Sequence, residues 1–328
     1  MKHFFIINPH SFKYAEEMNK VIAECESAAS QADCSIYISR TRRDAVAVVY
    51  RHLSDIPADE TVRVYAIGGD GILFDCLNGL IDFPNAELTS VPHGYANDFI
   101  RAFGEDAKPA FRDIKKLSVS PSRPVDILCG GANYAINGVN IGIGGQTTLY
   151  ANAILRSSHK KWFNKFIPKV YTFSALRALF DKDVREQKYT IYMDGEDVSD
   201  AYANIHIANG PCNGGSMIPS PYAVPDDGWL DVITLQATHI PGFVKTVRDY
   251  ERGRFENSKN THKYRRCKVI EVQSENPFYI EMDGEAFMAD EMKFEVAPKG
   301  IKFFAPEGIW FADYSYMTHN GGKGGSEV

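Results

Sequence analysis

Short apolar runs alternate with amphipathic segments through the N-terminal part of the chain. The run His3–Ile7 is followed by Ala15, Met18, Ile22 and Cys25, which recur at the spacing of one helix face. Three more apolar runs follow, and continuous apolar runs are typical of parallel strands buried on both faces. The predicted strands cover residues 3–7, 35–39, 62–67 and 88–91. Strands that alternate with helices predict a doubly wound, Rossmann-like parallel sheet.

Beyond Arg123 the pattern changes to short strands separated by turns. The predicted strands cover residues 125–127, 132–139, 189–193, 203–208, 230–235, 268–272, 278–282 and 292–296. Such a series predicts a mainly antiparallel β-sandwich or open barrel. A helical insertion is predicted at about Thr147–Phe180, and a second short helix at Gly242–Arg252.

The two patterns divide the 328 residues into two predicted domains. Residues 1–123 are expected to form the α/β domain, and residues 124–305 the β-rich domain. Residues 306–320 are a candidate to pack back on the first domain. The glycine-rich residues 321–328 are expected to form a disordered tail.

Composition narrows the class of protein further. The chain is 44% hydrophobic and 24% charged, with a net charge of −6, which predicts a soluble globular protein and argues against broad nucleic-acid binding. Its six cysteines lie far apart without a CxxC pair, so reduced thiols are expected. The sequence shows neither a signal-peptide core nor an apolar run long enough to span a membrane. We therefore expect a cytoplasmic protein, with peripheral membrane contact left open.

A glycine-rich turn follows the third predicted strand directly. The strand ends at Ile67, the sequence Gly68-Gly69-Asp70-Gly71 comes next, and a helical pattern begins at Ile72. Glycines let a backbone approach phosphate, and free N–H groups at a helix start point toward an anion. A carboxylate beside phosphate needs a cation between them, so Asp70 indicates Mg²⁺ bound with a nucleotide. The alternative is a tight strand-to-helix turn with a capping Asp.

Polar residues also end the other predicted parallel strands. Asn8 begins the turn after the first strand, Thr41 follows the second, and Gly94–Asp98 follows the fourth. Thr41 has the position of a helix N-cap, with Asp44 three residues later. Because ligands bind beyond the carboxyl ends of parallel strands, these turns favour the phosphate-site interpretation.

Five sequence blocks, in order along nearly the whole chain, resemble the diacylglycerol kinase catalytic-domain family. This family includes bacterial diacylglycerol and related YegS-like lipid kinases, sphingosine kinases and ceramide kinases, and its fold is NAD-kinase-like. The family blocks NPxSG, GGDGTxxEVxNG, PxGTxNDFAR, NG…GGG…PDDGxLDV and DGE are similar to residues 8–12, 68–79, 92–101, 209–232 and 283–285.

The resemblance implies a nucleotide-binding α/β domain, a β-rich substrate domain and an ATP site in the cleft between them. It implies transfer of the γ-phosphate of ATP to a hydroxyl of a lipid such as diacylglycerol, with Asp70 handling Mg·ATP. The residues expected around ATP are Asn8, Ser11, Thr41, Gly68, Gly69, Asp70, Gly71, Ile72, Gly94, Tyr95 and Asn97. It also implies a structural Mg²⁺ near Asp227, with the carbonyls of Val224 and Trp229 as further ligands.

The resemblance further implies that a carboxylate of the DGE block accepts the proton of the lipid hydroxyl. Asp283 and Glu285 are the candidates, and the sequence does not choose between them. Met-Asp-Gly-Glu occurs twice, however, at residues 193–196 and 282–285. Asp-Gly between two strands predicts a hairpin turn, which is the better interpretation for Asp194 and the alternative for Asp283.

Three positions depart from the family pattern. Ile72 and Tyr95 replace threonines expected at the nucleotide phosphates, and Phe12 replaces a glycine. A lost charge-assisted hydrogen bond costs roughly 1.5–3 kcal/mol. The departures therefore favour, as an alternative, an impaired pseudokinase that binds nucleotide or lipid. A third alternative is a GGDG kinase with a soluble substrate such as NAD.

The predicted helical insertion carries a basic and aromatic segment. Residues 156–169 hold five cations and no acid, interleaved with Trp162, Phe163 and Phe166. Cations beside aromatics suit an anionic membrane surface, so the segment is a candidate for lipid contact. The alternative is an ordinary helix with a solvated basic face. The sequence leaves open whether the protein forms a homodimer.

Overall fold

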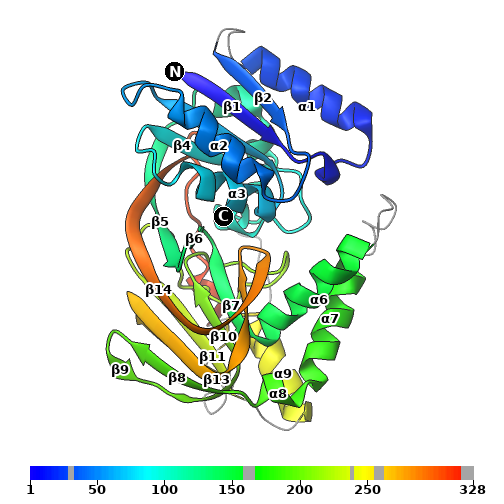
Figure 1. Cartoon of the computed structure of the whole chain (residues 1–328), viewed down its shortest axis with the longest axis vertical. Coiled ribbons are helices and arrows are strands. Elements are labelled where there is room, and N and C mark those ends of the chain that lie inside the picture. The colour runs from blue at the N-terminus through cyan, green and yellow to red at the C-terminus, as the bar shows by residue number, and fades with distance from the viewer. Residues whose placement is uncertain (29–32, 158–166, 237–239, 255–261, 319–328) are drawn as a thin grey trace.

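The computed structural model describes residues 1–28, 33–157, 167–236, 240–254 and 262–318. The chain forms two lobes, one above the other in Figure 1, and a single 14-stranded sheet joins the described strands of both. We call the part of the chain up to residue 121 the N-terminal lobe. Residues 122–282 are called the β-lobe, and the long strand at residues 285–304 connects the two.

The N-terminal lobe contains the predicted parallel sheet, in the strand order β4-β3-β1-β2. Its strands are β1 (Lys2–Ile7), β2 (Cys34–Ile38), β3 (Val62–Gly68) and β4 (Ala86–Pro92). Its helices are η1 (Pro9–Ser11), α1 (Ala15–Ala28), α2 (Asp44–Ser54), α3 (Asp70–Leu80), α4 (Asp98–Arg101), η2 (Ala110–Arg112) and α5 (Ile114–Leu117). Every residue of β3 is buried, as expected for a central parallel strand. The prediction of a Rossmann-like sheet is confirmed.

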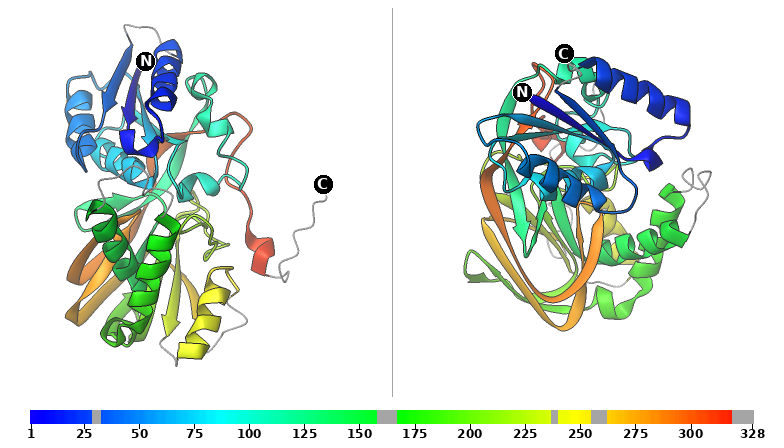
Figure 2. Two further views of the ribbon diagram at one scale, coloured as in Figure 1. Left: turned by 90° about the vertical axis from the view of Figure 1, so that its right-hand side faces the viewer. Right: turned by 45° about the horizontal axis from the view of Figure 1, so that its top comes forward.

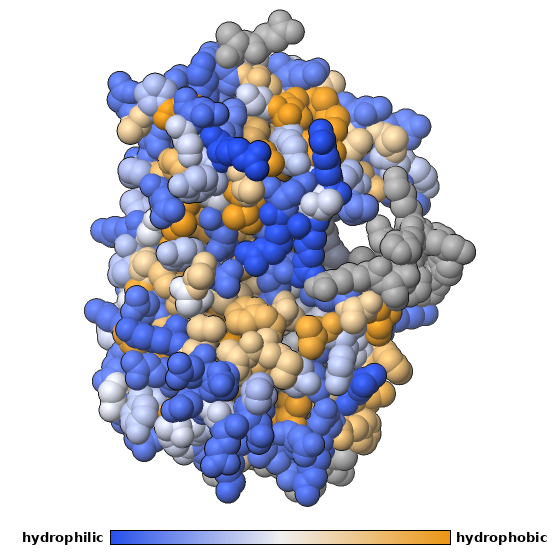
Figure 3. All heavy atoms as spheres, in the orientation of Figure 1, coloured by the Kyte–Doolittle hydropathy of each residue, from blue (hydrophilic) through white to orange (hydrophobic). Residues whose placement is uncertain are grey.

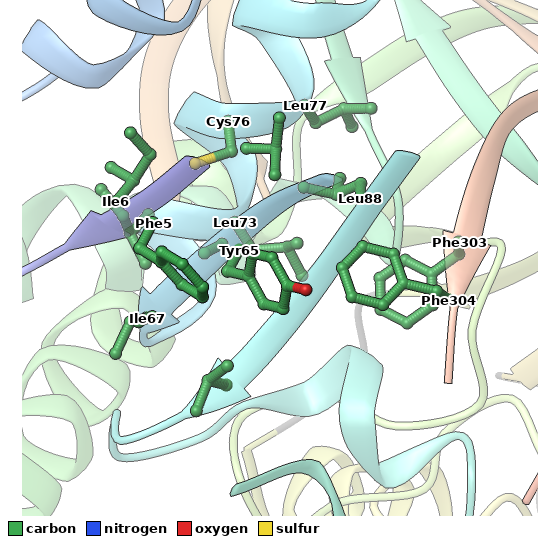
Figure 4. Close-up of a cluster of buried hydrophobic side chains, with 14 of the residues drawn as sticks. Phe5, Ile6, Tyr65, Ile67, Leu73, Cys76, Leu77, Leu88, Phe303 and Phe304 are labelled. Atoms are coloured by element: carbon green, nitrogen blue, oxygen red, sulfur yellow. The ribbon is translucent and has the colours of Figure 1, made fainter. Parts of the chain in front are cut away.

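The core of this lobe includes side chains from the far end of the chain. Tyr65 of β3 stacks on Phe5, with ring centroids 4.3 Å apart, and meets the edge of Phe304 at 4.9 Å (Figure 4). Phe304 ends β14 (Glu285–Phe304), whose neighbouring Phe303 pairs in parallel with Leu88 of β4. The C-terminal strand therefore extends the parallel sheet, and this pairing was not predicted.

The β-lobe is mainly antiparallel, and its strands follow the order β12-β11-β10-β7-β13-β14. Its strands are β5 (Ser122–Gly130), β6 (Asn133–Ala135), β7 (Gly138–Gly142), β8 (Lys188–Met193), β9 (Glu196–Asp197), β10 (Asp200–Ala208), β11 (Leu230–Gln236), β12 (His262–Cys267) and β13 (Val269–Met282). The fold-class prediction, an α/β part followed by an antiparallel β part, is confirmed.

Helices cover one side of the β-lobe, where α6 and α7 form an adjacent pair (Figures 1 and 2). They are α6 (Ile143–Ser157), α7 (Ile167–Phe180), α8 (Lys182–Arg185) and α9 (Ile240–Tyr250). The predicted insertion thus contains two long helices, and most of the basic segment 156–169 lies outside the residues whose side chains are described. Within the described ranges, none of the helices is long and apolar enough to span a bilayer.

The segment after β14 contacts the N-terminal lobe before ending in η5 (Ser315–Thr318). The amide of Ala312 donates to the carbonyl of Ala102 at 2.8 Å, and the hydroxyl of Tyr314 donates to the carbonyl of Arg101 at 2.6 Å. These two hydrogen bonds connect residues 312 and 314 to the N-terminal lobe. The exact domain limits stay a prediction, and the expected tail at 321–328 lies outside the described residues.

Candidate active site

Two glycine turns at the carboxyl ends of β3 and β4 lie against each other. The amides of His93 and Gly94 both donate to the carbonyl of Gly68 at 2.8 Å. A Cβ on Gly94 would lie only 2.2 Å from the Cα of Gly69. Glycine is therefore required for this close approach, which brings the predicted phosphate turn and the fourth turn into one structure.

Asp70 links the two turns through its carboxylate. Its oxygens accept the amides of Asn97 and Asp98, each at 2.8 Å. Burial is the largest cause that raises the pKa of Asp70, and the nearby carboxylate of Asp98 is the second largest. The capping alternative was thus partly right, although Asp70 caps the start of α4 rather than its own helix. Because a carboxylate oxygen has two lone pairs, each oxygen can still bind a cation.

The N-terminus of α3 faces open space beside Asp70. Its N-cap is Gly69, and the first amides of the helix cannot bond within it. Gly71 is exposed, and outside its chain neighbours and the backbone of its own helix no described atom lies within 4 Å of the position that a Cβ on it would take. Backbone donors, a helix dipole and a carboxylate able to hold a cation therefore meet at one accessible point.

The three residues that depart from the family pattern do not close the N-terminus of α3. Ile72 is 4% exposed and packs in the core of the lobe. Phe12 is also buried, and its ring lies 4.8 Å from that of His93 under the fourth turn. Tyr95 is 57% exposed. The two apolar replacements thus fill core space, and Tyr95 points a large part of its side chain to solvent.

Asn8 and Ser11 lie at the end of β1, against the same glycine turn. The amide of Asn8 donates to the carbonyl of Ile67 at 2.9 Å, and the Ser11 hydroxyl oxygen would lie 3.0 Å from a Cβ on Gly68. Asn97 closes the fourth turn, because its side-chain amide donates to the carbonyl of Gly94 at 2.7 Å. The structure thus brings together the predicted residues from β1, β3 and β4.

The predicted N-cap at Thr41 is wrong. Helix α2 begins at Asp44, and its N-cap is Arg43, which has a left-handed φ of 61°. The carboxylate of Asp44 folds back over the preceding loop, where it accepts the amides of Arg40 at 2.7 Å and Thr41 at 3.1 Å. The loop therefore uses its acid to satisfy its own amides, and Thr41 serves as one of the donors.

The DGE hairpin joins β13 to β14, and its aspartate is buried. Asp283 has a φ of 44°, and its carboxylate accepts the amides of Ile136 at 2.7 Å and Gly138 at 2.9 Å, with Asn137 also in range. Burial raises the pKa of Asp283 to about 6, although these amides favour the charged form. Its negative charge is also one of the smaller causes that raise the pKa of Asp70.

The second Met-Asp-Gly-Glu segment forms the same kind of turn in an exposed place. Asp194 and Gly195 have φ values of 49° and 86°, close to the 44° and 91° of Asp283 and Gly284. The carboxylate of Asp194 accepts the amides of Lys268 at 3.0 Å and Val269 at 2.9 Å. Both segments are hairpin turns, as their Asp-Gly pairs predict. They differ in burial, since Asp283 is buried and Asp194 is exposed.

Glu285 forms an ion pair across the two lobes. Its carboxylate accepts two hydrogen bonds from the guanidinium of Arg42, from the loop before α2. Next to it, Arg43 lies 3.8 Å from Asp75, and burial raises the pKa of Asp75 to about 7. Hydrophilic side chains gather in the middle of the face shown in Figure 3, between the two lobes. Sequence analysis did not single out Arg42, Arg43 or Asp75.

Asp98 makes another contact between the lobes. Its carboxylate accepts the amide of Gly215 at 2.8 Å and a guanidinium hydrogen bond from Arg101 at 3.3 Å. Arg101 also donates to the carbonyl of Met217 at 3.2 Å. The path from Asp70 through Asp98 therefore continues into the glycine-rich loop of the β-lobe. Sequence analysis placed Asp98 in the turn after the fourth predicted strand, but its contact with Gly215 lies too far along the chain for local patterns to reveal.

The residues implied to hold a structural metal lie in one turn but do not offer a free set of ligands. Asp227 forms an ion pair with Arg266 and accepts the amide of Trp229 at 3.0 Å. The carbonyl of Val224 accepts the amides of Asp226 at 2.8 Å and Asp227 at 3.2 Å. In the described ranges, no group of three or more His, Cys, Asp and Glu side chains could hold a metal.

Comparison with known proteins agrees with the order of the blocks. Residues 2–129 match the diacylglycerol kinase catalytic domain, and residues 140–305 match the YegS C-terminal NAD kinase beta sandwich-like domain. The chain belongs to this diacylglycerol kinase and YegS-like family. The resemblance inferred from the motifs is therefore confirmed.

Curated relatives and solved structures extend the match. A "Probable lipid kinase YegS-like" of Shewanella frigidimarina is 29% identical over 267 residues, which cover 78% of this chain and 80% of that protein. A protein of the same name from Pseudomonas putida is 28% identical over 75% of this chain and 78% of its own length. A crystal structure described as a diacylglycerol kinase from Bacillus anthracis has a TM-score of 0.68 at 21% identity, covering 94% of this chain and 98% of that one. The structural likeness shows the fold.

A row of buried polar side chains was missed by sequence analysis. Glu281, Asn140 and His206 lie opposite one another on the neighbouring strands β13, β7 and β10. The side-chain amide of Asn140 donates to Glu281 at 2.7 Å, and its oxygen lies 3.0 Å from Nδ1 of His206. Burial raises the pKa of Glu281 to about 7. The signal in the sequence was a single acidic residue, Glu281, between Ile280 and Met282. Strand alternation places it on the face opposite to these two apolar side chains.

Proposed function

We propose that the protein is an ATP-dependent lipid kinase, which transfers the γ-phosphate of ATP to a hydroxyl of a lipid such as diacylglycerol. The observation that carries the proposal is the contact between the GGDG side and the DGE side of the two lobes: Asp98, whose amide binds Asp70, accepts the amide of Gly215, and Glu285 of the DGE hairpin pairs with Arg42. The family match and the names of the relatives support the same reaction class.

In this proposal, the phosphates of ATP lie at the N-terminus of α3, where backbone amides and the helix dipole stabilise their charge. Asp70 binds the Mg²⁺ that accompanies ATP, using the lone pairs that its amide contacts leave free. Asp283 accepts the proton of the lipid hydroxyl as the hydroxyl oxygen forms a bond to the γ-phosphorus. The bond to the bridging oxygen breaks, and ADP leaves with that electron pair.

The proposal is tested by incubating the protein with Mg²⁺, γ-labelled ATP and a total lipid extract in mixed micelles. We expect label in the organic phase, because a lipid hydroxyl is the acceptor. Label on NAD or another soluble compound would instead show a soluble acceptor. ATP binding without transfer to any acceptor would show a nucleotide-binding pseudokinase.

We further propose that an exposed apolar stripe on α7 contacts an anionic membrane. Phe173, Leu176 and Phe180 are 60%, 52% and 60% exposed, and their spacing puts them on one helix face. Lys169 at the start of the same helix is exposed, and the sequence before it carries four more cations without an acid. Apolar side chains beside cations favour a surface of anionic lipid.

Replacing both Phe173 and Leu176 with Ser should weaken binding to phosphatidylglycerol vesicles by at least about tenfold, because burial of each side chain contributes roughly 1.5–3 kcal/mol. Co-sedimentation with the vesicles measures the change. Val119→Ser is a suitable control, since Val119 is 83% exposed in the N-terminal lobe. Equal binding by the double variant and the control would contradict the α7 contact.

A further inference from the structure

An ion pair and hydrogen bonds from backbone amides together stabilise the turn between Pro225 and Leu230. Gly228 has a φ of 78°, and its amide donates to the buried Asp126 at 2.6 Å. Asp227 reaches outward and pairs with the guanidinium of Arg266, on the edge strand β12. The side chains of Asp227 and Arg266 are 27% and 36% exposed.

Arg266 faces a second carboxylate that is completely buried. Backbone register places Arg266 directly opposite Asp231, and its Nε lies 3.6 Å from a carboxylate oxygen whose side chain is 0% exposed. The other oxygen of Asp231 accepts the hydroxyl of Tyr264. Because a buried carboxylate needs a positive partner, Arg266 supplies the charge that balances both Asp227 and Asp231.

The side chain of Arg266 is also held in place by an aromatic ring. Its guanidinium carbon lies 5.5 Å from the centroid of the Trp229 ring, and the ammonium of Lys268 lies 5.0 Å from the same centroid. A guanidinium between two carboxylates and over an indole is in a favourable arrangement for charge and cation–π contact. The turn thus already contains a cation, supplied by the protein.

We propose that the guanidinium of Arg266 takes the place of the structural divalent cation at the Pro225–Leu230 turn. The family resemblance implies such an ion at Asp227, but here the carboxylate is paired and the carbonyl of Val224 already accepts two amides. The β-lobe therefore folds without a metal at this turn. This inference goes beyond the proposed phosphoryl transfer, whose Mg²⁺ comes with ATP at the other lobe.

The test is the midpoint of thermal unfolding, Tm, measured without nucleotide after dialysis against EDTA and again with added Mg²⁺. The wild-type Tm should be the same in both conditions. Arg266→Gln leaves two facing carboxylates uncompensated, so its Tm in EDTA should fall by about 5 °C or more. Added Mg²⁺ should recover part of that loss, because two free carboxylates can bind the ion.

The neighbouring Arg265 provides a matched control. It pairs with Glu196 at 2.7 Å, and both side chains of this pair are exposed, so Arg265→Gln should change Tm little and show no response to Mg²⁺. Arg266→Lys keeps the charge and should restore most of the Tm. A wild-type Tm that falls in EDTA and recovers with Mg²⁺ would overturn the proposal, even if Arg266→Gln does not fold. A Tm of Arg266→Gln equal to that of Arg265→Gln would also overturn it.

Discussion

Replacing Asp70 with Asn should lower the kcat for phosphoryl transfer by at least about 10³-fold, because the charge that holds Mg·ATP is lost. The Asn side chain keeps the size of Asp and one oxygen acceptor. One of the two amide contacts to Asn97 and Asp98 is therefore retained. The measurement is the initial rate of label transfer, together with the affinity for ATP in the presence of Mg²⁺.

Asp70→Ala separates the loss of charge from the loss of the turn contacts. It removes both amide contacts, so its Tm should fall below that of Asp70→Asn. If charge is the cause of inactivity, the two variants should be about equally inactive although their stabilities differ. If Asp70 acts only as a cap, Asp70→Asn should keep most of its activity, and only Asp70→Ala should be strongly impaired.

The parallel sheet could be predicted because its strands are buried on both faces. A continuous apolar run such as 62–67 is stable only where both faces of the strand are buried. The turn that follows it contains three glycines. The position of the phosphate turn could be predicted for the same reason, since strand, turn and helix are adjacent in the chain. The local sequence pattern is therefore enough to predict this strand, the glycine turn and the helix that follows.

The connections between the lobes could not be predicted, because they depend on residues far apart in the chain. Strand β14 adds to the parallel sheet only through a pairing with β4, in which Phe303 lies opposite Leu88, 215 positions earlier in the chain. Edge strand β12 was missed because Lys263, Arg265 and Arg266 give it the charge typical of exposed loops. Arg42 and Glu285 are single charged residues without any local signal of their pairing.

The predicted strand 132–139 is divided in the structure for a reason that involves the site. It separates into β6 and β7 at Ile136 and Asn137, whose amides donate to Asp283. Apolar residues lie on both sides of this break, at Ala135, Ile136 and Val139, so the sequence predicts one strand. The carboxylate that divides it comes from the opposite end of the β-lobe sequence, and only the tertiary structure reveals the contact.

Asp283→Asn should lower kcat by about 10²–10⁴-fold, whereas Asp194→Asn should leave it nearly unchanged. The two aspartates lie in the same four-residue sequence and the same kind of hairpin turn, and each accepts backbone amides, so the pair controls for the loss of the turn contact. Both variants should be less stable, with a smaller loss at Asp194 because it is exposed. Rates are compared per folded molecule, with Tm measured on the same samples.

The pH dependence of kcat/KM for the lipid decides between Asp283 and Glu285 as the base, provided that saturating Mg·ATP keeps Asp70, whose pKa is also raised, in its ionised form. A base must be deprotonated, and burial raises the pKa of Asp283 to about 6, so the wild-type kcat/KM should fall as pH decreases below about 6. Glu285→Gln breaks the ion pair with Arg42 but keeps Asp283, so this acid limb should remain. In Asp283→Asn the limb should disappear along with most of the activity. If Glu285→Gln removes the limb and Asp283→Asn retains it, Glu285 is the base and Asp283 serves only to position the strands around it.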